Sequence, residues 1–233
     1  MVTGTRARSY DEMVDALAEE GLPALQDALS GLTPEDWERS TRLQPPEPGK
    51  PPWTVLELAA HFDVFMGLTM GLVAEPMSAQ PVVDRASFYI SVSDRSKVSP
   101  VIYQYIVDHA EGHTPAMIRD KVDETFKQAL EAIKTTPPGT IGPGFFGPMR
   151  LDEFVATRLV ETQVHGMDLT DTLGAPLLSM PRVTTMAAEV LDEVLARRAV
   201  PGRPADLEDD DLAFIRAAAG RGDHPDPRLP IVG

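Results

Sequence analysis

The sequence predicts an all-α protein built on a four-helix bundle. Apolar residues recur at helical spacing in several long segments, capping signals precede these segments, and no stretch of useful length alternates apolar and polar residues as a half-buried strand does. Four long helices favour an up-and-down bundle. Short extra helices and a C-terminal tail are expected around it.

The first long helix is expected to begin after Ser9, which forms a capping box with Glu12. Pro23 is expected to kink or split this helix, because proline lacks a backbone N–H and clashes with the preceding turn. A capped turn at Thr33-Pro34 and a proline-rich loop over residues 44–52 follow. The apolar stripe consists of Met13, Leu17, Leu22, Leu25 and Leu29.

A central helix is expected over residues 55–74. Thr54 forms a capping box with Glu57, and the segment is apolar nearly all round, which indicates burial on every side. This segment comes nearest to a membrane span, but charged and polar residues, His61 among them, interrupt it. Residues 76–97 show no clear period and are expected to form a loop, with room for a short helix.

The second half of the chain contains two further proline-marked helix starts, at Ser99-Pro100 and Thr114-Pro115. Residues 135–148 are rich in glycine and proline and contain Phe145-Phe146. They are expected to form a long loop, which either closes a pocket as a lid or only buries its own aromatic rings. The remaining expected helices cover residues 151–173 (ended by Gly174), 181–199 and 212–219.

Composition restricts the classes of function. The 233 residues are 42% hydrophobic and 24% charged, which suits a globular protein with its own core. A formal net charge of −15 repels phosphate backbones and anionic lipids, so neither nucleic acid nor a membrane is an expected partner. Residues 1–8 are basic without an apolar segment behind them, so we expect no secretion signal and a cytoplasmic protein, monomeric or homodimeric.

The absence of cysteine excludes disulfides and thiolate metal ligands. Any metal must be bound by histidine and carboxylate side chains. Any thiol chemistry must use a thiol that a small molecule supplies.

Glu161 and His165 lie four residues apart, so a helix presents both on one face. This spacing suits a metal ion, although surface helices carry such pairs routinely. Most of the face is polar, and the alternative is that it is the solvent side of an amphipathic helix. The face consists of Phe154, Arg158, Glu161, His165, Asp168 and Thr172.

His61 is the candidate third ligand. It lies in the middle of the apolar helix, where a lone histidine is commonly a hydrogen-bonded core residue, but no partner for it is evident nearby in the sequence. Two imidazoles and a carboxylate suit Zn²⁺ well and Ni²⁺ or Fe²⁺ acceptably. Three protein ligands leave coordination positions open, as catalytic metal sites require.

Arg158 and Asp168 are the candidate catalytic residues beside these ligands. Arg158 either anchors a carboxylate substrate or pairs with Glu161 or Glu153. Asp168 either orients a metal-bound imidazole or caps and solvates the helix end. The remaining histidines are expected on the surface or in loops, with His113 off the helix and His224 solvated; they are His109, His113 and His224.

Two segments resemble the DinB-like, mycothiol-dependent maleylpyruvate isomerase family. Residues 53–61 (WTVLELAAH) resemble that family's W-x-V-x-D-L-x-A-H motif, and residues 161–169 (ETQVHGMDL) resemble its E-x-x-x-H-G-W-D-L motif. The resemblance extends over about residues 10–200. Met167 stands where tryptophan is common, and the chain is expected to lack the full second domain that the isomerases often carry.

The resemblance implies a four-helix bundle that binds a metal through His61, Glu161 and His165, with mycothiol as thiol co-substrate. We therefore expect a metal-binding bundle domain over residues 1–200 and a short extension over residues 201–233. The expected function is thiol transfer to, or isomerisation of, a small electrophile lodged between the helices and the 135–148 loop. The alternatives are a hydrolase or lyase that uses metal-activated water, and a non-catalytic bundle that binds a small ligand.

Overall fold

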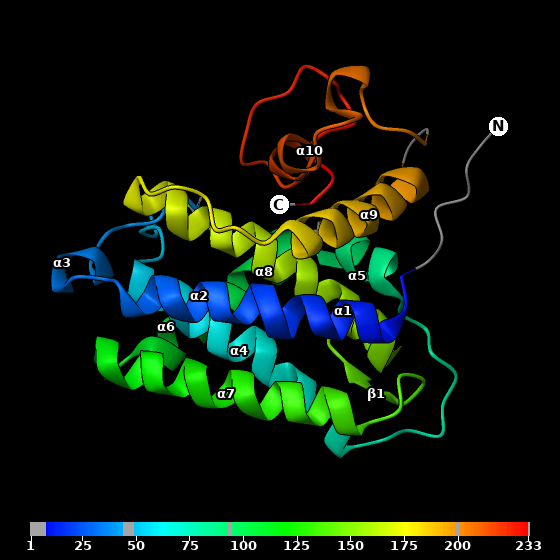
Figure 1. The fold of residues 1–233 in the computed structure, drawn as a ribbon, viewed down its shortest axis with the longest axis horizontal. Helices are drawn as coiled ribbons and strands as arrows, with labels where there is room; N and C mark the ends of the chain where they lie inside the picture. The colour runs from blue at the N-terminus through cyan, green and yellow to red at the C-terminus, as the bar shows by residue number, and fades with distance from the viewer. Residues whose placement is uncertain (1–7, 44–48, 93–94, 199–200, 233) are drawn as a thin grey trace.

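The computed structural model describes residues 8–43, 49–92, 95–198 and 201–232, with no side chains described for residues 95–99. The fold is all-α, as predicted, with a bundle of four long helical rods (Figure 1). The second and third rods along the chain run parallel to each other, and the first and fourth run antiparallel to them, so the strict up-and-down order that we expected is wrong. The rods are α1 (Tyr10–Ala16) with α2 (Leu22–Ser30), α4 (Val55–Ala74), α7 (Pro115–Thr135) and α8 (Leu151–Leu173). The first rod, formed by α1 and α2, packs against α7 and α8.

Local signals set the start of the first rod. The Ser9–Glu12 capping box is present in both directions, and the helix begins at Tyr10. Pro23 does not break the rod, because a π-helical turn, η1 (Leu17–Gly21), joins α1 to α2 and places the proline in the first turn of α2. Thr33 caps the four-residue α3 (Pro34–Trp37). Of the expected 44–52 loop, residues 44–48 lie outside the described residues, and 49–52 form neither helix nor strand.

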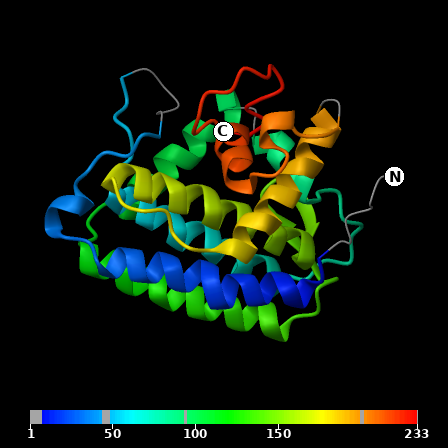
Figure 2. The same ribbon diagram turned by 45° about the horizontal axis from the view of Figure 1, so that its top comes forward.

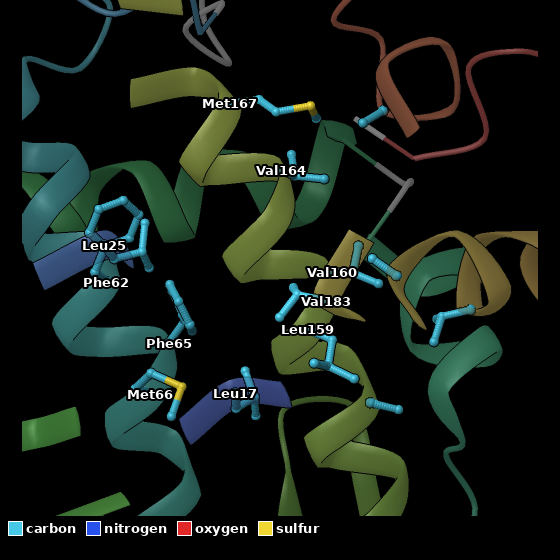
Figure 3. Packing of buried hydrophobic residues seen from close by; sticks show 14 of the residues in the cluster. Leu17, Leu25, Phe62, Phe65, Met66, Leu159, Val160, Val164, Met167 and Val183 are labelled. Carbon is cyan, nitrogen blue, oxygen red and sulfur yellow. The ribbon is translucent and has the colours of Figure 1, made fainter. Parts of the chain in front are cut away.

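The central helix is α4, and Thr54 with Glu57 caps it as predicted. It is long and apolar enough to cross a membrane, but 61% of the relevant window is buried inside the bundle. Phe62, Phe65 and Met66 of α4 lie in the core together with Leu17 and other side chains from the first rod (Figure 3). Its apolar character therefore reflects its central place in the bundle.

Two helices differ from the sequence-based expectation. Residues 85–92 form a helix, α5 (Arg85–Val92), inside the segment without clear period. The next helix, α6 (Arg95–Ala110), begins before Pro100 and contains it. A proline removes one helical hydrogen bond, which the neighbouring turns of this helix tolerate.

Residues 141–150 form a short β-hairpin and not a structureless loop. Strands β1 (Ile141–Gly144) and β2 (Gly147–Arg150) pair antiparallel. Gly142 approaches α4 so closely that a Cβ there would lie 1.9 Å from the backbone oxygen of Leu72. Short strands made of glycine and proline show no alternation, so the sequence pattern does not reveal them.

The segment after the bundle packs onto it. Helix α9 (Pro181–Arg198) lies along α8, and α10 (Asp211–Ala218) packs against α9 after the short 3₁₀ turn η2 (Ala205–Leu207) (Figure 1). Phe214 and Ile215 of α10 are fully buried. Turned by 45°, the molecule shows the C-terminal segment lying over α8 and α9 (Figure 2). The expected boundary between residues 200 and 201 lies at the edge of the described residues, because residues 199–200 are outside them.

Candidate metal centre

Helix α8 is buried on more than one face. Val155 and Leu159 are fully buried on the side predicted to be apolar, and Phe154 and Arg158 on the polar side are only 2% and 1% exposed. The polar face therefore points into the bundle, and the alternative of a solvent-facing side is excluded. A buried polar face is costly unless its groups are paired or bind an ion.

Three side chains on α4 and α8 converge at one point. His61, Glu161 and His165 each offer a potential ligand atom, and these atoms all lie within 4.8 Å of one another. The Nε2 atoms of His61 and His165 lie 3.5 and 3.3 Å from the same carboxylate oxygen, Oε2 of Glu161. The two imidazole rings meet edge to face with centroids 4.5 Å apart.

These distances fit the ligand set of a small tetrahedral cation. An ion with bonds of about 2.0–2.1 Å has ligand-to-ligand edges of about 3.3 Å, close to both separations from Oε2. The donors are two imidazoles and one carboxylate, the set found in many catalytic zinc sites. With three protein ligands, at least one coordination position stays available.

Burial and neighbouring charge shift the pKa values in this cluster in opposite directions. Burial, reinforced by His165, lowers the pKa of His61 to about 4. Burial would also lower the pKa of His165, but hydrogen bonds to Asp168 and Glu161 outweigh it and raise the pKa to about 9. Burial raises the pKa of Glu161, yet the two histidines dominate and hold it well below its usual range.

Asp168 contacts the imidazole of His165 on the side away from Glu161. Its Oδ2 lies 2.8 Å from Nδ1 of His165, and Arg221 holds both carboxylate oxygens through bonds of 2.9 Å. Burial raises the pKa of Asp168, but His165 and Arg221 outweigh it and lower the pKa to about 2. The ionised carboxylate can only accept, so Nδ1 of His165 carries a hydrogen, and Nε2 is the nitrogen that would bind an ion after it releases its own proton.

Arg158 lies inside the bundle, beneath the cluster. Its guanidinium donates to the backbone oxygen of Phe65 at 2.6 Å and to Thr157 Oγ1, and stacks over the ring of Phe154. The alternative partner Glu153 is instead paired with Arg85, at 2.7 Å. The guanidinium is buried and bonded to the core, which agrees with a structural role, and the expected contact of Arg158 with a substrate carboxylate stays a prediction.

Aromatic side chains surround His61. The ring of Trp53 lies 5.3 Å from the imidazole and that of Phe65 lies 5.6 Å away, while Tyr103 stacks on Trp53. Nδ1 of His61 and Nε1 of Trp53 are buried and have no hydrogen-bond partner within the described part of the chain. Two buried polar atoms without partners lie beside the candidate centre.

The other histidines differ from expectation in part. His113 lies off the helix, as predicted. His109, expected on the surface or in a loop, belongs to α6, and its Nε2 lies 2.7 Å from the buried Asp63, which Thr125 also contacts. His224 is not solvated: its side chain is 9% exposed and bonds to Asp206. Each correction arises from a carboxylate distant in sequence, which spacing alone cannot reveal.

The 135–148 segment does not cover the cluster. The hairpin packs on α4 at Leu72, eleven residues and therefore about 16 Å along the helix from His61. Phe146 packs on Phe88 of α5, and Phe145 is exposed. The expectation of a lid over the electrophile is therefore wrong.

Sequence reasoning missed three residues that contact the proposed ligands or their partner. Arg221 in the C-terminal segment binds Asp168, Tyr89 of α5 contacts Glu161, and Trp53 lies against His61. Trp53 had two available signals, its place one residue before the capping box and its place at the start of the 53–61 motif. Arg221 and Tyr89 come from segments without a recognisable motif.

Comparison with protein-family models identifies the class of protein. The mycothiol maleylpyruvate isomerase N-terminal domain model matches residues 18–170, which contain all three candidate ligands. The match covers more than half of the chain, so the protein belongs to this family. Comparison with curated protein sequences gave no match.

The fold is similar to that of solved mycothiol-dependent maleylpyruvate isomerases. One crystal structure of such an isomerase superposes with a TM-score of 0.62 at 14% identity, and a histidine-to-alanine mutant form superposes with a TM-score of 0.63 at 15% identity. In both, the match covers 92% of this chain and 90% of the solved one. This coverage gives no support to the expectation that a full second domain is lacking.

Proposed function

We propose that the protein is a cytoplasmic, metal-dependent enzyme that uses mycothiol to transfer a thiol to, or to isomerise, a small electrophilic substrate. Family membership supports the thiol and the isomerase or transferase class. The observation that carries the proposal is the convergence of two imidazole Nε2 atoms on one oxygen of Glu161. The absence of cysteine agrees with a thiol supplied from outside.

His61, Glu161 and His165 would bind the ion, with Zn²⁺ the best fit and Ni²⁺ or Fe²⁺ alternatives. A bound ion of this kind lowers the pKa of a thiol that enters its open position, so that the thiolate is available near neutral pH. Asp168 fixes the tautomer of His165 that suits a ligand. Arg158 acts on Glu161 through its positive charge.

The aromatic side of the cluster is the proposed binding place for the small molecules. Trp53, Tyr103 and Phe65 supply apolar ring surface next to His61. When Nε2 of His61 is a ligand, its Nδ1 carries a hydrogen, as Nε1 of Trp53 does. Both donors are buried without an acceptor among the residues that the structure describes, so an oxygen atom of a bound substrate or thiol is the group that would satisfy them.

Metal content and thiol binding test this proposal together. Purified protein is expected to contain close to one equivalent of a divalent metal, measured by elemental analysis. The variants His61→Ala and His165→Ala should each empty the site, and mycothiol should bind the metal-loaded wild type in calorimetry. His109→Ala is the matched control, because it removes a histidine of α6 that pairs with Asp63 on α4 and lies outside the candidate centre.

Two results would contradict the proposal. Unchanged metal content in both ligand variants would refute the assigned ligands. Turnover of esters or amides without any heat of mycothiol binding would instead indicate a hydrolase that acts through metal-activated water.

A further inference from the structure

The side chain of Tyr89 reaches the candidate metal centre from α5. Its hydroxyl oxygen lies 3.0 Å from Oε1 of Glu161 and 2.9 Å from the backbone oxygen of Thr157, and the residue is 3% exposed. The histidines approach the other carboxylate oxygen, Oε2. The two oxygens of Glu161 thus have different partners.

Only one of the two groups in the contact between Tyr89 and Glu161 carries a hydrogen that it can donate. A carboxylate that binds a metal is ionised and can only accept hydrogen bonds. Tyr89 is therefore the donor, and its single hydroxyl hydrogen has two acceptors within reach, Oε1 of Glu161 at 3.0 Å and the carbonyl oxygen of Thr157 at 2.9 Å. The carbonyl of Thr157 lies within α8, where the helical ladder supplies it with a donor of its own.

Helix α5 is fixed so that the hydroxyl keeps this position. Arg85 binds both carboxylate oxygens of Glu153 on α8, at 2.7 and 3.1 Å. Asp84, one residue earlier, accepts a bond of 2.7 Å from Arg197 on α9. The adjacent Phe88 is covered by Phe146 of the hairpin. Ion pairs to two helices and an aromatic contact thus hold the backbone that carries Tyr89.

We propose that Tyr89 is a positioning residue of the metal centre, whose hydroxyl occupies Oε1 of Glu161 and leaves Oε2 as the single oxygen offered to the ion. This inference rests on the proposed function, because it concerns the same site. A carboxylate freed from this bond could rotate and offer both oxygens, which would fill a position that the substrate needs. Tyr89 therefore helps to keep the coordination sphere open.

The variant Tyr89→Phe tests this role, because it removes the hydroxyl and keeps the ring. We expect its zinc affinity to fall by roughly 10–100-fold, measured by competition with a chromophoric chelator. In the cobalt(II) form, we expect weaker visible absorption, since a carboxylate bound through two oxygens raises the coordination number. Tyr10→Phe is the matched control: it also removes a tyrosine hydroxyl bonded to a backbone oxygen, that of Ile133 at 2.9 Å, and should leave both readouts unchanged.

The possible outcomes test the proposed metal centre and the role of Tyr89 separately. If the wild type takes up no metal, both the proposed metal centre and the role of Tyr89 are overturned. If the wild type binds zinc and Tyr89→Phe binds it within twofold with the same cobalt spectrum, only the role of Tyr89 is overturned. Should the variant fail to fold, the hydroxyl hydrogen can be located by NMR in zinc-loaded wild type. If the hydroxyl hydrogen of Tyr89 contacts the Glu161 side chain, the proposed role is supported. If it contacts only the Thr157 backbone, the role is overturned.

Discussion

Nδ1 of His165 lies 2.8 Å from Oδ2 of Asp168, which is three residues further along α8. The same carboxylate is held from the other side by Arg221, which belongs to the segment after the bundle. A chain of contacts therefore leads from the C-terminal segment through Asp168 to a proposed metal ligand. Carboxylate partners of this kind fix the ring orientation and raise the basicity of a ligating histidine.

Replacing Asp168 by asparagine should weaken metal binding. The neutral amide is a poorer acceptor for Nδ1–H, so we expect roughly 10–100-fold lower zinc affinity in a chelator competition assay. Asp171→Asn is the control, because Asp171 lies on the same helix and pairs with Arg216 instead. Equal affinities for wild type and Asp168→Asn would show that this contact does not act on the metal.

Replacing Arg221 by glutamine should destabilise the metal-free protein. It leaves the carboxylate of Asp168, whose side chain is 6% exposed, with one charged partner fewer. We expect a loss of about 3 kcal/mol in the free energy of unfolding, measured with urea. Arg216→Gln breaks the more exposed pair with Asp171 and should cost less than about 1 kcal/mol. Similar losses in the two variants would argue against a special role for Arg221.

Replacing Gly142 by alanine should disrupt the packing of the hairpin on α4. The added Cβ would lie 1.9 Å from the backbone oxygen of Leu72, so the strand must shift, and we expect a loss of about 3 kcal/mol in unfolding free energy. Gly139→Ala, where a Cβ has nothing within 4 Å, should change stability little. Because the hairpin lies far from His61, zinc affinity should stay unchanged, and a large drop would place the hairpin near the site.

The anchoring of α5 through Asp84 should depend on pH. Partial burial raises the pKa of Asp84, but hydrogen bonds from Arg197 and Ser87 outweigh it and lower the pKa from 3.8 to about 2. A depressed folded-state pKa stabilises the fold above the unfolded value, and this stabilisation is lost as the pH falls from about 4 to about 2. The difference in unfolding free energy between wild type and Asp84→Asn should therefore narrow over this range. A difference that stays constant down to about pH 2 would contradict the argument.

Local signals were sufficient for most of the helices. The capping boxes at Ser9 and Thr54 and the cap at Thr114 lie where the helices begin, and Gly174 ends α8 in the left-handed conformation with φ 66°. These signals succeed because they depend on residues within one turn of each other. They fail for α5 and the β-hairpin, whose formation depends on packing against α8, α9 and α4.

The features of the candidate site also fall into two groups, those that local spacing predicts and those that depend on how the helices pack. The spacing of Glu161 and His165 on one helix is a local property, and so their common direction was predictable. The approach of His61 from α4 was an expectation that required the two helices to face each other. The contacts of Tyr89 and Arg221 lie 72 and 53 residues away in sequence from their partners, and no local pattern indicates them.

By itself, the sequence determined the helical class and the start and end of most helices, and it indicated three side chains as candidate ligands of a cation in a chain without cysteine. These depend on periodicity, capping and ligand chemistry, all of which act over a few residues. Only the tertiary structure decided that Arg158 is buried beneath the site, that the glycine-rich hairpin lies away from it, and that Tyr89 and Arg221 contact it. Such contacts join segments far apart in the chain, so they are set by how the helices pack and not by local preference.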